Sequence, residues 1–224
     1  MSSQHLTAPE HVARTASPHH DAPASAGPLS HIHEHPEIES TDLAEVRRLL
    51  RTPGRVLDVG AGRGGFVLLA RGGGVEACAL DLEPSAAPIW RQRGVPGVLA
   101  DAFNPPFQNG AFAVVRLKEI IEHVEDPRAL VVTARALLRP GGCILAHVPS
   151  PYSQFYPVGN FWDDYTHVRP FSRLALQRLF EDSGMILVSI AGYTAGRNAV
   201  ERALGKLVAS FLPHTYRVVA RRAP

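Results

Sequence analysis

The stretch of sequence that decides the fold is RVLDVGAGRGGF, which runs from Arg55 to Phe66. A short apolar run opens it, as in a buried strand, and a glycine-rich turn leads into a second apolar stretch. Gly60 and Gly62 let the backbone turn tightly and allow a ligand to approach the main chain closely. The pattern therefore predicts a strand, a ligand-binding turn and a helix in succession.

The same alternation of apolar runs and helical stretches continues along the chain. Strands are expected at 55–59, 75–82, 97–102, 112–117, 142–148, 185–192 and 216–222. Helices are expected at 40–50, 65–71, 85–93, 127–138, 172–183 and 198–212. Strands that alternate with helices form a mostly parallel sheet covered on both faces. We therefore expect an α/β fold with a doubly wound, Rossmann-like, seven-stranded sheet.

Composition and charge exclude several classes of protein. The 224 residues carry a formal net charge of +2, without the dense block of lysine or arginine that indicates a nucleic-acid partner. No apolar run reaches the ~20 residues of a membrane span, and the N-terminus lacks an apolar signal core. Cys78 and Cys143 lie in apolar runs, as reduced core thiols do. We expect a cytoplasmic monomer or homodimer without a membrane span.

Residues 1–38 differ in composition from the rest of the chain. They are rich in Ser, Ala, Pro and His and show no apolar period, which predicts a disordered tail before a domain at 39–224. His31, His33 and His35 alternate in HIHEH, but a disordered segment offers no preorganised metal site. We expect no metal there, and a tail that closes over the active site is the better hypothesis.

Two cofactors fit the glycine loop. With Gly65 it matches the dinucleotide fingerprint G-x-G-x-x-G, and with Gly64 and the preceding Asp58 it matches D-x-G-x-G-x-G, the loop that holds S-adenosylmethionine. A dinucleotide would place its pyrophosphate at the start of the following helix. An acid at this strand end would repel a pyrophosphate but attract the ammonium group of S-adenosylmethionine. Asp58 therefore favours S-adenosylmethionine.

Acids at the ends of the next two strands support that choice. Asp81 ends the second strand some twenty residues after the loop, where a carboxylate can bind both ribose hydroxyls of either cofactor. Asp101 ends the third strand, where it can accept a hydrogen bond from an adenine amino group while the amide of Ala102 reaches a ring nitrogen. Acids at three successive strand ends outline an adenosine that carries an amino acid.

The chain resembles the class I S-adenosylmethionine-dependent methyltransferases over about 55–224. The matching motifs are VLDVGAGRGG, ALDLEP, ADAFNPPFQNGAF, KEIIEHVEDP and LLRPGGCILAHVP. The resemblance implies S-adenosyl-L-methionine as cofactor, S-adenosyl-L-homocysteine as product, and an antiparallel last strand at 216–222. The implied cofactor-binding residues are Asp58, Gly60, Ala61, Gly62, Asp81, Leu82, Asp101, Ala102, Phe103 and Lys118. Ala113 and Lys118 depart from the family pattern, in which Asp and an apolar residue are commoner.

Aromatic residues concentrate after the fifth strand. Seven of the sixteen aromatics fall between Tyr152 and Phe171. Ligands bind beyond the carboxyl ends of parallel strands, so this segment is interpreted as a wall of the acceptor site. The candidate substrate-binding residues are Tyr152, Phe161, Trp162, Tyr165 and Arg169. Aromatic faces suit a sugar, an arene or a lipid-like acceptor equally.

Three residues are candidates for acid–base chemistry. His167 lies near Asp163 and Asp164, and an imidazole has the pKa of a base that works near neutrality. His123 follows the fourth strand, in EHVEDP. The catalytic hypothesis names His167, Asp164 and His123. The alternative is structural: His167 and Arg169 would hold their loop, and His123 would lead into the next helix.

The acceptor is predicted from one further motif. The run from Asp164 to Ser172, DYTHVRPFS, is similar to bacterial methyltransferases that act on hydroxyls, including those of surface glycans. It favours O-methylation of a small molecule or carbohydrate. Methylation of nitrogen or carbon, a non-catalytic regulatory relative and an NAD-dependent dehydrogenase remain alternatives, the last disfavoured by Asp58 and Asp101.

Overall fold

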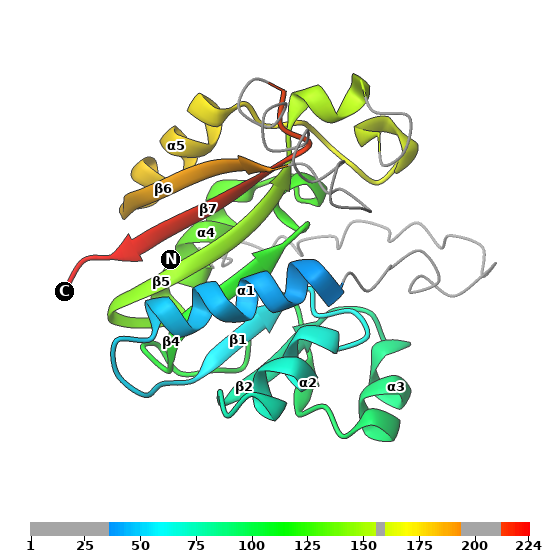
Figure 1. Cartoon of the computed structure of the whole chain (residues 1–224), viewed down its shortest axis with the longest axis vertical. Helices are drawn as coiled ribbons and strands as arrows, with labels where there is room; N and C mark the ends of the chain where they lie inside the picture. The colour runs from blue at the N-terminus through cyan, green and yellow to red at the C-terminus, as the bar shows by residue number, and fades with distance from the viewer. Residues whose placement is uncertain (1–35, 156–159, 194–211) are drawn as a thin grey trace, which may run out of the picture.

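The strand of the opening motif lies inside a seven-stranded sheet with the order β3-β2-β1-β4-β5-β7-β6 (Figure 1). The computed structural model describes residues 36–155, 160–193 and 212–224. The strands are β1 (Val56–Val59), β2 (Ala77–Asp81), β3 (Gly97–Leu99), β4 (Phe112–Lys118), β5 (Leu138–Pro149), β6 (Met185–Tyr193) and β7 (Thr215–Arg222). Each overlaps one of the apolar runs expected from the sequence, and β3 is shorter than expected, since it ends at Leu99, two residues before Asp101.

The direction of the strands sets the place of a ligand site. β1 pairs in parallel with both β2 and β4, so the strand order reverses there, and ligands of such sheets bind beyond the carboxyl ends at that switch point. β7 lies between β5 and β6 and is antiparallel to both. The expected seven-stranded, mostly parallel sheet with an antiparallel last strand is confirmed.

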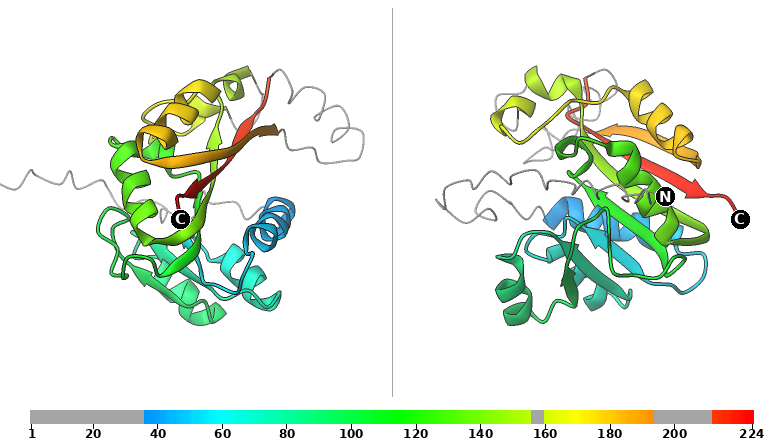
Figure 2. Two further views of the ribbon diagram at one scale, coloured as in Figure 1. Left: turned by 90° about the vertical axis from the view of Figure 1, so that its left-hand side faces the viewer. Right: turned by 180° about the vertical axis from the view of Figure 1, so that it is seen from behind.

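Helices cover both faces of the sheet. α1 (Pro36–Leu49), α2 (Gly65–Gly72) and α3 (Ala86–Arg93) share one apolar core, to which α1 contributes Leu43 and Val46. α4 (Pro127–Leu137) and α5 (Arg173–Asp182) contribute to the core on the other face. Figure 2 shows the sheet between these two layers. None of the helices in the described ranges is both long and apolar enough to cross a membrane.

Local sequence signals explain where the helices begin. Asp126 and Ser172 precede α4 and α5, and each side chain accepts a hydrogen bond from a backbone amide of the first turn, as helix caps do. α1 begins at Pro36, so 36–38 form its first turn instead of the end of the tail; proline suits a helix start, where its missing N–H is not needed. Residues 1–35 and most of the expected helix at 198–212 lie outside the described residues.

Three short 3₁₀-helices that the sequence did not predict lie near the carboxyl ends of β4 and β5. They are η2 (Ile121–His123), η3 (Pro151–Phe155) and η4 (Phe161–Asp163). Elements of three to five residues are too short to produce a detectable apolar period. η2 and η4 nevertheless position the histidines described below.

Candidate active site

The glycine loop adopts a conformation that requires glycine. Gly62 and Gly64 have φ of 52° and 78°, in the left-handed region. A Cβ on Gly64 would lie 2.8 Å from the side chain of Val95, so the loop also needs the missing side chain for packing. The indole of Trp90 donates a hydrogen bond to the Gly62 carbonyl over 2.8 Å. The loop is thus held in a fixed shape at the carboxyl end of β1.

The predicted ribose ligand lies beside this loop. Asp81 accepts hydrogen bonds from the backbone amides of Gly62, over 2.7 Å, and Glu83, over 2.9 Å. These bonds fix the carboxylate at the end of β2, while its side chain remains half-buried. The arrangement suits a carboxylate that accepts hydrogen bonds from two hydroxyls, and this role stays a prediction.

Exposed apolar side chains lie next to the other predicted cofactor residues. Leu82 and Phe103 are 70% and 39% exposed, although both are large and apolar. Asp101 accepts a hydrogen bond from the amide of Phe103 over 2.9 Å, which fixes its carboxylate at the surface, and Ala102 between them is half-buried. Apolar surface beside a fixed carboxylate is what an adenine ring with its amino group would need. The described residues therefore fit the adenosine part of S-adenosylmethionine.

Asp58 lies in a different environment from the one its sequence position suggested. Its carboxyl is 1% exposed and accepts a hydrogen bond from Arg116 over 2.8 Å. Burial raises the pKa of Asp58, and the positive charge of Arg116 opposes that rise. Arg116 therefore offsets much of the charge that was expected to attract an ammonium group. Direct binding of the cofactor by Asp58 remains a prediction.

Arg116 belongs to a buried polar network that sequence reasoning missed. Asp42 of α1, which is fully buried, accepts hydrogen bonds from Arg116 over 2.8 Å and from His147 Nε2 over 2.7 Å. The Nδ1 atom of His147 lies 2.8 Å from the hydroxyl of Tyr193. The network joins α1 to β1, β4, β5 and β6. An arginine inside the apolar run FAVVRL was the one sequence signal for it.

The segment after β4 lies against the glycine loop. A Cβ on Gly60 would lie 3.5 Å from the side chain of Ile120, which immediately precedes η2. Lys118 ends β4 and is half-buried, and its place near the methionine end of the cofactor remains a prediction. Glu119 has a φ of 51°, which is rare for a residue other than glycine. Such backbone strain is concentrated at functional sites.

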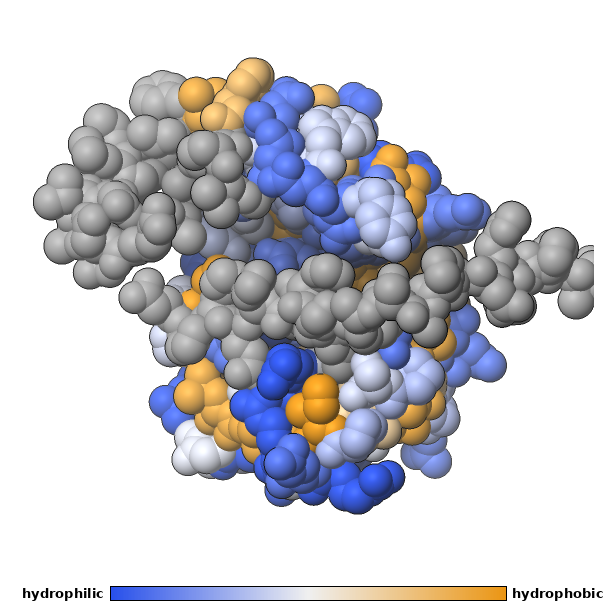
Figure 3. All heavy atoms as spheres, turned by 90° about the vertical axis from the view of Figure 1, so that its right-hand side faces the viewer, coloured by the Kyte–Doolittle hydropathy of each residue, from blue (hydrophilic) through white to orange (hydrophobic). Residues whose placement is uncertain are grey.

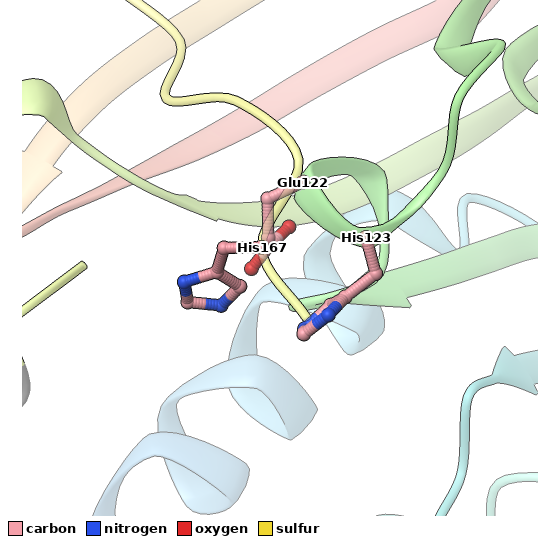
Figure 4. Close-up of side chains that lie close together, drawn as sticks. All are labelled: Glu122, His123 and His167. Atoms are coloured by element: carbon pink, nitrogen blue, oxygen red, sulfur yellow. The ribbon is translucent and has the colours of Figure 1, made fainter. Parts of the chain in front are cut away.

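Beside this strained residue, Glu122, His123 and His167 come together (Figure 4). One ligand atom from each side chain lies within 4.8 Å of the other two. The ring centroids of the two histidines are 4.6 Å apart. Glu122 and His123 come from η2, and the amide of Val168 donates to the Glu122 carbonyl over 2.8 Å, which holds the His167 segment against η2. The predicted pair of histidines thus forms one cluster.

Hydrogen bonds fix the orientation of both imidazoles. His167 Nδ1 lies 2.6 Å from the carbonyl oxygen of Phe161, which can only accept. His123 Nδ1 lies 2.9 Å from the hydroxyl of Thr166, and that hydroxyl donates to Asp164 over 2.6 Å. Asp164 therefore acts on His123 through Thr166. Its predicted neighbour Asp163 instead accepts from the amide of Asn160 and caps η4.

Burial changes the ionisation of the cluster. Burial raises the pKa of Glu122 well above its ordinary value, and the negative charge of Glu119 adds to the rise. Burial also lowers the pKa of His123, and the adjacent His167 lowers it further. The neutral imidazole of His123 is favoured near neutral pH. Glu122 directly precedes His123 in the motif EHVEDP, but nothing in that motif indicates that its carboxyl is fully buried.

The predicted aromatic wall is only partly exposed. Tyr165, Trp162 and Tyr152 are 95%, 62% and 37% exposed, so their rings are available to an acceptor. Phe161 is 1% exposed and stacks on His167 with ring centroids 4.4 Å apart, so it supports the imidazole from below the surface. Arg169 donates to the carbonyl of Glu125 over 2.8 Å and ties its loop to the start of α4.

The carboxyl edge of the sheet combines these features. Figure 3 looks onto this side of the molecule, where hydrophilic and hydrophobic side chains are interspersed over the described surface. A glycine loop after β1 and carboxylates at or just beyond the ends of β2 and β3 are the arrangement expected of a class I methyltransferase. A comparison of the sequence with protein families supports this class: residues 35–190 match the family whose description is "Methyltransferase domain". The chain belongs to this family.

Curated relatives match part of the chain. A ubiquinone biosynthesis O-methyltransferase from Xanthomonas oryzae pv. oryzae is 33% identical over 95 residues, which cover 39% of this chain and 40% of that protein. A protein of the same name from Bordetella bronchiseptica is 35% identical over 97 residues, or 40% of each chain. The match thus spans about two fifths of the length of these relatives.

Solved structures share the fold over most of the chain. A SAM-dependent methyltransferase from Archaeoglobus fulgidus has a TM-score of 0.64 and 22% identity, and the alignment covers 82% of this chain and 94% of that one. The 1,6-didemethyltoxoflavin-N1-methyltransferase of Burkholderia thailandensis, solved with its acceptor and S-adenosylhomocysteine, has a TM-score of 0.60 and 21% identity over 83% of this chain and 78% of that one. The expected fold class and cofactor, S-adenosylmethionine, are confirmed at the level of the family.

Proposed function

We propose that this protein transfers the methyl group of S-adenosylmethionine to a hydroxyl of a small-molecule or glycan acceptor. The observation that carries the proposal is the pair His123 and His167, held together beyond the carboxyl end of β4 with their Nδ1 atoms hydrogen-bonded. Hydroxyls are weak nucleophiles until they lose a proton, and a positioned imidazole is the usual acceptor of that proton.

The proposed step is an in-line displacement. The bound cofactor supplies a methyl group activated by positive sulfur. As the acceptor oxygen forms its bond to the methyl carbon, the carbon–sulfur bond breaks, and the hydroxyl proton passes to Nε2 of His167. The Phe161 carbonyl, which accepts from Nδ1, fixes the tautomer in which Nε2 carries the lone pair.

Positioning supplies the rest of the rate enhancement. Holding two reactants in line is worth ~7–11 kcal/mol, and a methyl transfer depends strongly on that alignment. Tyr165 and Trp162 expose rings near the imidazoles that could hold a flat or sugar-like acceptor. The names of the relatives from Xanthomonas and Bordetella also favour an oxygen of a small molecule as the methyl acceptor.

Two measurements test the proposal. Calorimetry should detect binding of S-adenosylhomocysteine and no binding of NAD to the full chain. The protein should then be incubated with labelled S-adenosylmethionine and a panel of catechols, phenols, sugars and amines, followed by mass spectrometry of the products. Methyl ethers are the expected products. Methylation of amines alone, or tight cofactor binding without turnover on any hydroxyl, would contradict O-methylation.

A further inference from the structure

The carboxyl of Glu122 is fully buried, and among the residues that the structure describes no other residue donates a hydrogen bond to it. Its side chain is 0% exposed. A buried polar group normally has a hydrogen-bond partner, because burial without one costs free energy. Here the carboxyl faces two imidazoles within 4.8 Å (Figure 4). A cation would satisfy such a carboxyl.

Each of the two imidazoles carries a lone pair on one ring nitrogen. The Phe161 carbonyl can only accept, so His167 Nδ1 must carry the proton and Nε2 the lone pair. The Thr166 hydroxyl gives its proton to Asp164, so it accepts from His123 Nδ1, and Nε2 of His123 also carries a lone pair. Metal-binding histidines are held in this way, with the second ring nitrogen donating to a carbonyl or to a carboxylate-linked group.

We propose that Glu122, His123 and His167 form a binding site for one divalent transition-metal cation of the Zn²⁺ or Mn²⁺ class. Two imidazoles and one carboxylate suit such cations better than Mg²⁺ or Ca²⁺, which prefer oxygen ligands. Three protein ligands also leave a coordination position open, as in catalytic sites. Metal–ligand bonds of about 2.0–2.2 Å require the three side chains to close inward when the ion binds.

Burial and charge are compatible with this occupant. A cation supplies the positive charge that would keep a fully buried Glu122 ionised, and the nearby carboxylates of Glu119 and Asp164 add favourable charge. The two histidines are half-buried, so one side of the cluster is accessible to solvent. An ion and the oxygen of an acceptor can both enter from that side.

The consequence for catalysis rests on the proposed function. With the cation bound, Nε2 of His167 is a ligand and no longer a base. A hydroxyl that occupies the open position becomes more acidic, because a bound cation lowers the pKa of a coordinated oxygen. Its proton then leaves to solvent water before the oxygen attacks the methyl carbon and the carbon–sulfur bond breaks. The metal and the general base are alternative routes to the same nucleophile.

The test must separate this cluster from the histidines of residues 1–38. Seven of the eleven histidines lie in that segment, so a full-length variant in which all seven are replaced by Ala is the reference protein. After treatment with a chelator, the reference should bind one Zn²⁺ by calorimetry, and Co²⁺ should give the visible absorption of a nitrogen- and oxygen-ligated ion. The absence of a bound ion in the reference and in the unmodified chain would overturn the proposal.

Ligand variants in the reference protein decide which residues hold the ion. His167→Ala and Glu122→Gln should each weaken Zn²⁺ binding by at least the about 10–100-fold that loss of a supporting group costs. Glu125→Gln, which changes an exposed carboxylate three residues away, should leave it unchanged. His167 is on a surface segment, so its variant remains informative if Glu122→Gln fails to fold. Unchanged affinity in folded His167→Ala would overturn the site.

The same measurements keep the metal site and the proposed function apart. Full methyl transfer to a hydroxyl by the chelated protein, with no ion bound, would overturn the catalytic role of the cation and leave O-methylation intact, while the binding measurements above decide whether the site exists. A bound ion lost in His167→Ala, without methyl transfer to any hydroxyl, would support the site and contradict O-methylation.

Discussion

Arg116 and Asp58 face each other across the pairing of β1 and β4, and their side chains are joined by a 2.8 Å hydrogen bond. Asp42 of α1 contacts the same guanidinium from the neighbouring layer, over 2.7 Å. Both acids and the arginine are almost fully buried. A helix that precedes the first strand is thereby connected through one arginine to the acid in front of the glycine loop. The stability of α1 and the shape of the cofactor loop should therefore be coupled.

Replacement of Asp42 tests this coupling. Asp42→Ala leaves Nε2 of His147 and part of the Arg116 guanidinium without this carboxylate, and loss of one member of a buried pair costs about 3–5 kcal/mol of unfolding free energy. Urea denaturation of the wild type and the variant measures the loss. Glu45→Ala removes a pair with Arg48, whose side chain is 63% exposed, and should cost much less stability than Asp42→Ala. Equal effects of the two substitutions would contradict a special role for Asp42.

The contribution of Asp42 should depend on pH. Burial alone would raise the pKa of Asp42, but hydrogen bonds and charges from His147 and Arg116 outweigh it and hold the pKa below the ordinary 3.8. A carboxyl with a lowered pKa in the folded protein stabilises it above the unfolded-state pKa, and this contribution is lost as pH falls through the folded-state pKa. The charged or titratable groups that interact with Asp42 include Arg116, His147, Asp58, Tyr193 and, on the same helix, Glu45.

The difference in unfolding free energy between wild type and Asp42→Asn should therefore be constant from pH 5 to pH 7 and shrink below about pH 4. Urea titrations at several pH values measure this difference directly. Asp58 has the opposite shift, so Asp58→Asn should not show the same loss at low pH. A difference for Asp42→Asn that grows as the solution is acidified would show that folding raises the pKa of Asp42 instead of lowering it.

The cofactor assignment is tested at Asp81. Asp81→Asn keeps an oxygen that can accept from the Gly62 amide but loses the charge that strengthens hydrogen bonds from ribose hydroxyls. Such charge-assisted bonds contribute about 1.5–3 kcal/mol each, so affinity for S-adenosylhomocysteine should fall at least about tenfold. Glu83→Gln, two residues along the same turn, is the matched control. Calorimetry that finds unchanged affinity in a folded Asp81→Asn protein would remove Asp81 from the site.

The boundary of the folded domain is tested by truncation. A chain that begins at Pro36 keeps all of α1, including Leu43, Val46 and the buried Asp42, and should melt close to the temperature of the full chain. A chain that begins at Gly54 loses this layer and exposes the Arg116 network, so its melting temperature should be clearly lower. If the two truncated chains have the same melting temperature, α1 is not part of the cooperatively folding unit.

The strands and most helices could be predicted because their signals are local. Apolar runs, Pro127 after Asp126 and the cap at Ser172 mark elements without reference to the rest of the chain. The pairing of Asp58 with Arg116 depends on the register between two strands, which no local pattern contains. The burial of Glu122 likewise depends on how a three-residue helix turns against β5, so the sequence showed its place in the chain but not its environment.

His167 gives the sharpest test of the chemistry. The interpretation requires a lone pair on Nε2, whether it accepts a proton or binds a cation, and the hydrogen bond from Nδ1 to Phe161 fixes that tautomer. His167→Ala should lower kcat by about 10²–10⁴-fold, the usual contribution of a positioned base, and leave the affinity for S-adenosylhomocysteine nearly unchanged. His214→Ala, a partly buried histidine beside Thr215 in the described C-terminal segment, is the matched control.

The alternative, in which His167 has only a structural role, predicts different results. If His167 only supports its loop against Phe161 and η2, His167→Ala should lower the melting temperature, and activity should fall in proportion to the folded protein that remains. His167→Gln separates the two cases further, because its amide can still donate to the Phe161 carbonyl but has no basic nitrogen. A folded His167→Gln protein with near-normal kcat would show that alignment of the acceptor, without proton transfer to this residue, accounts for the rate.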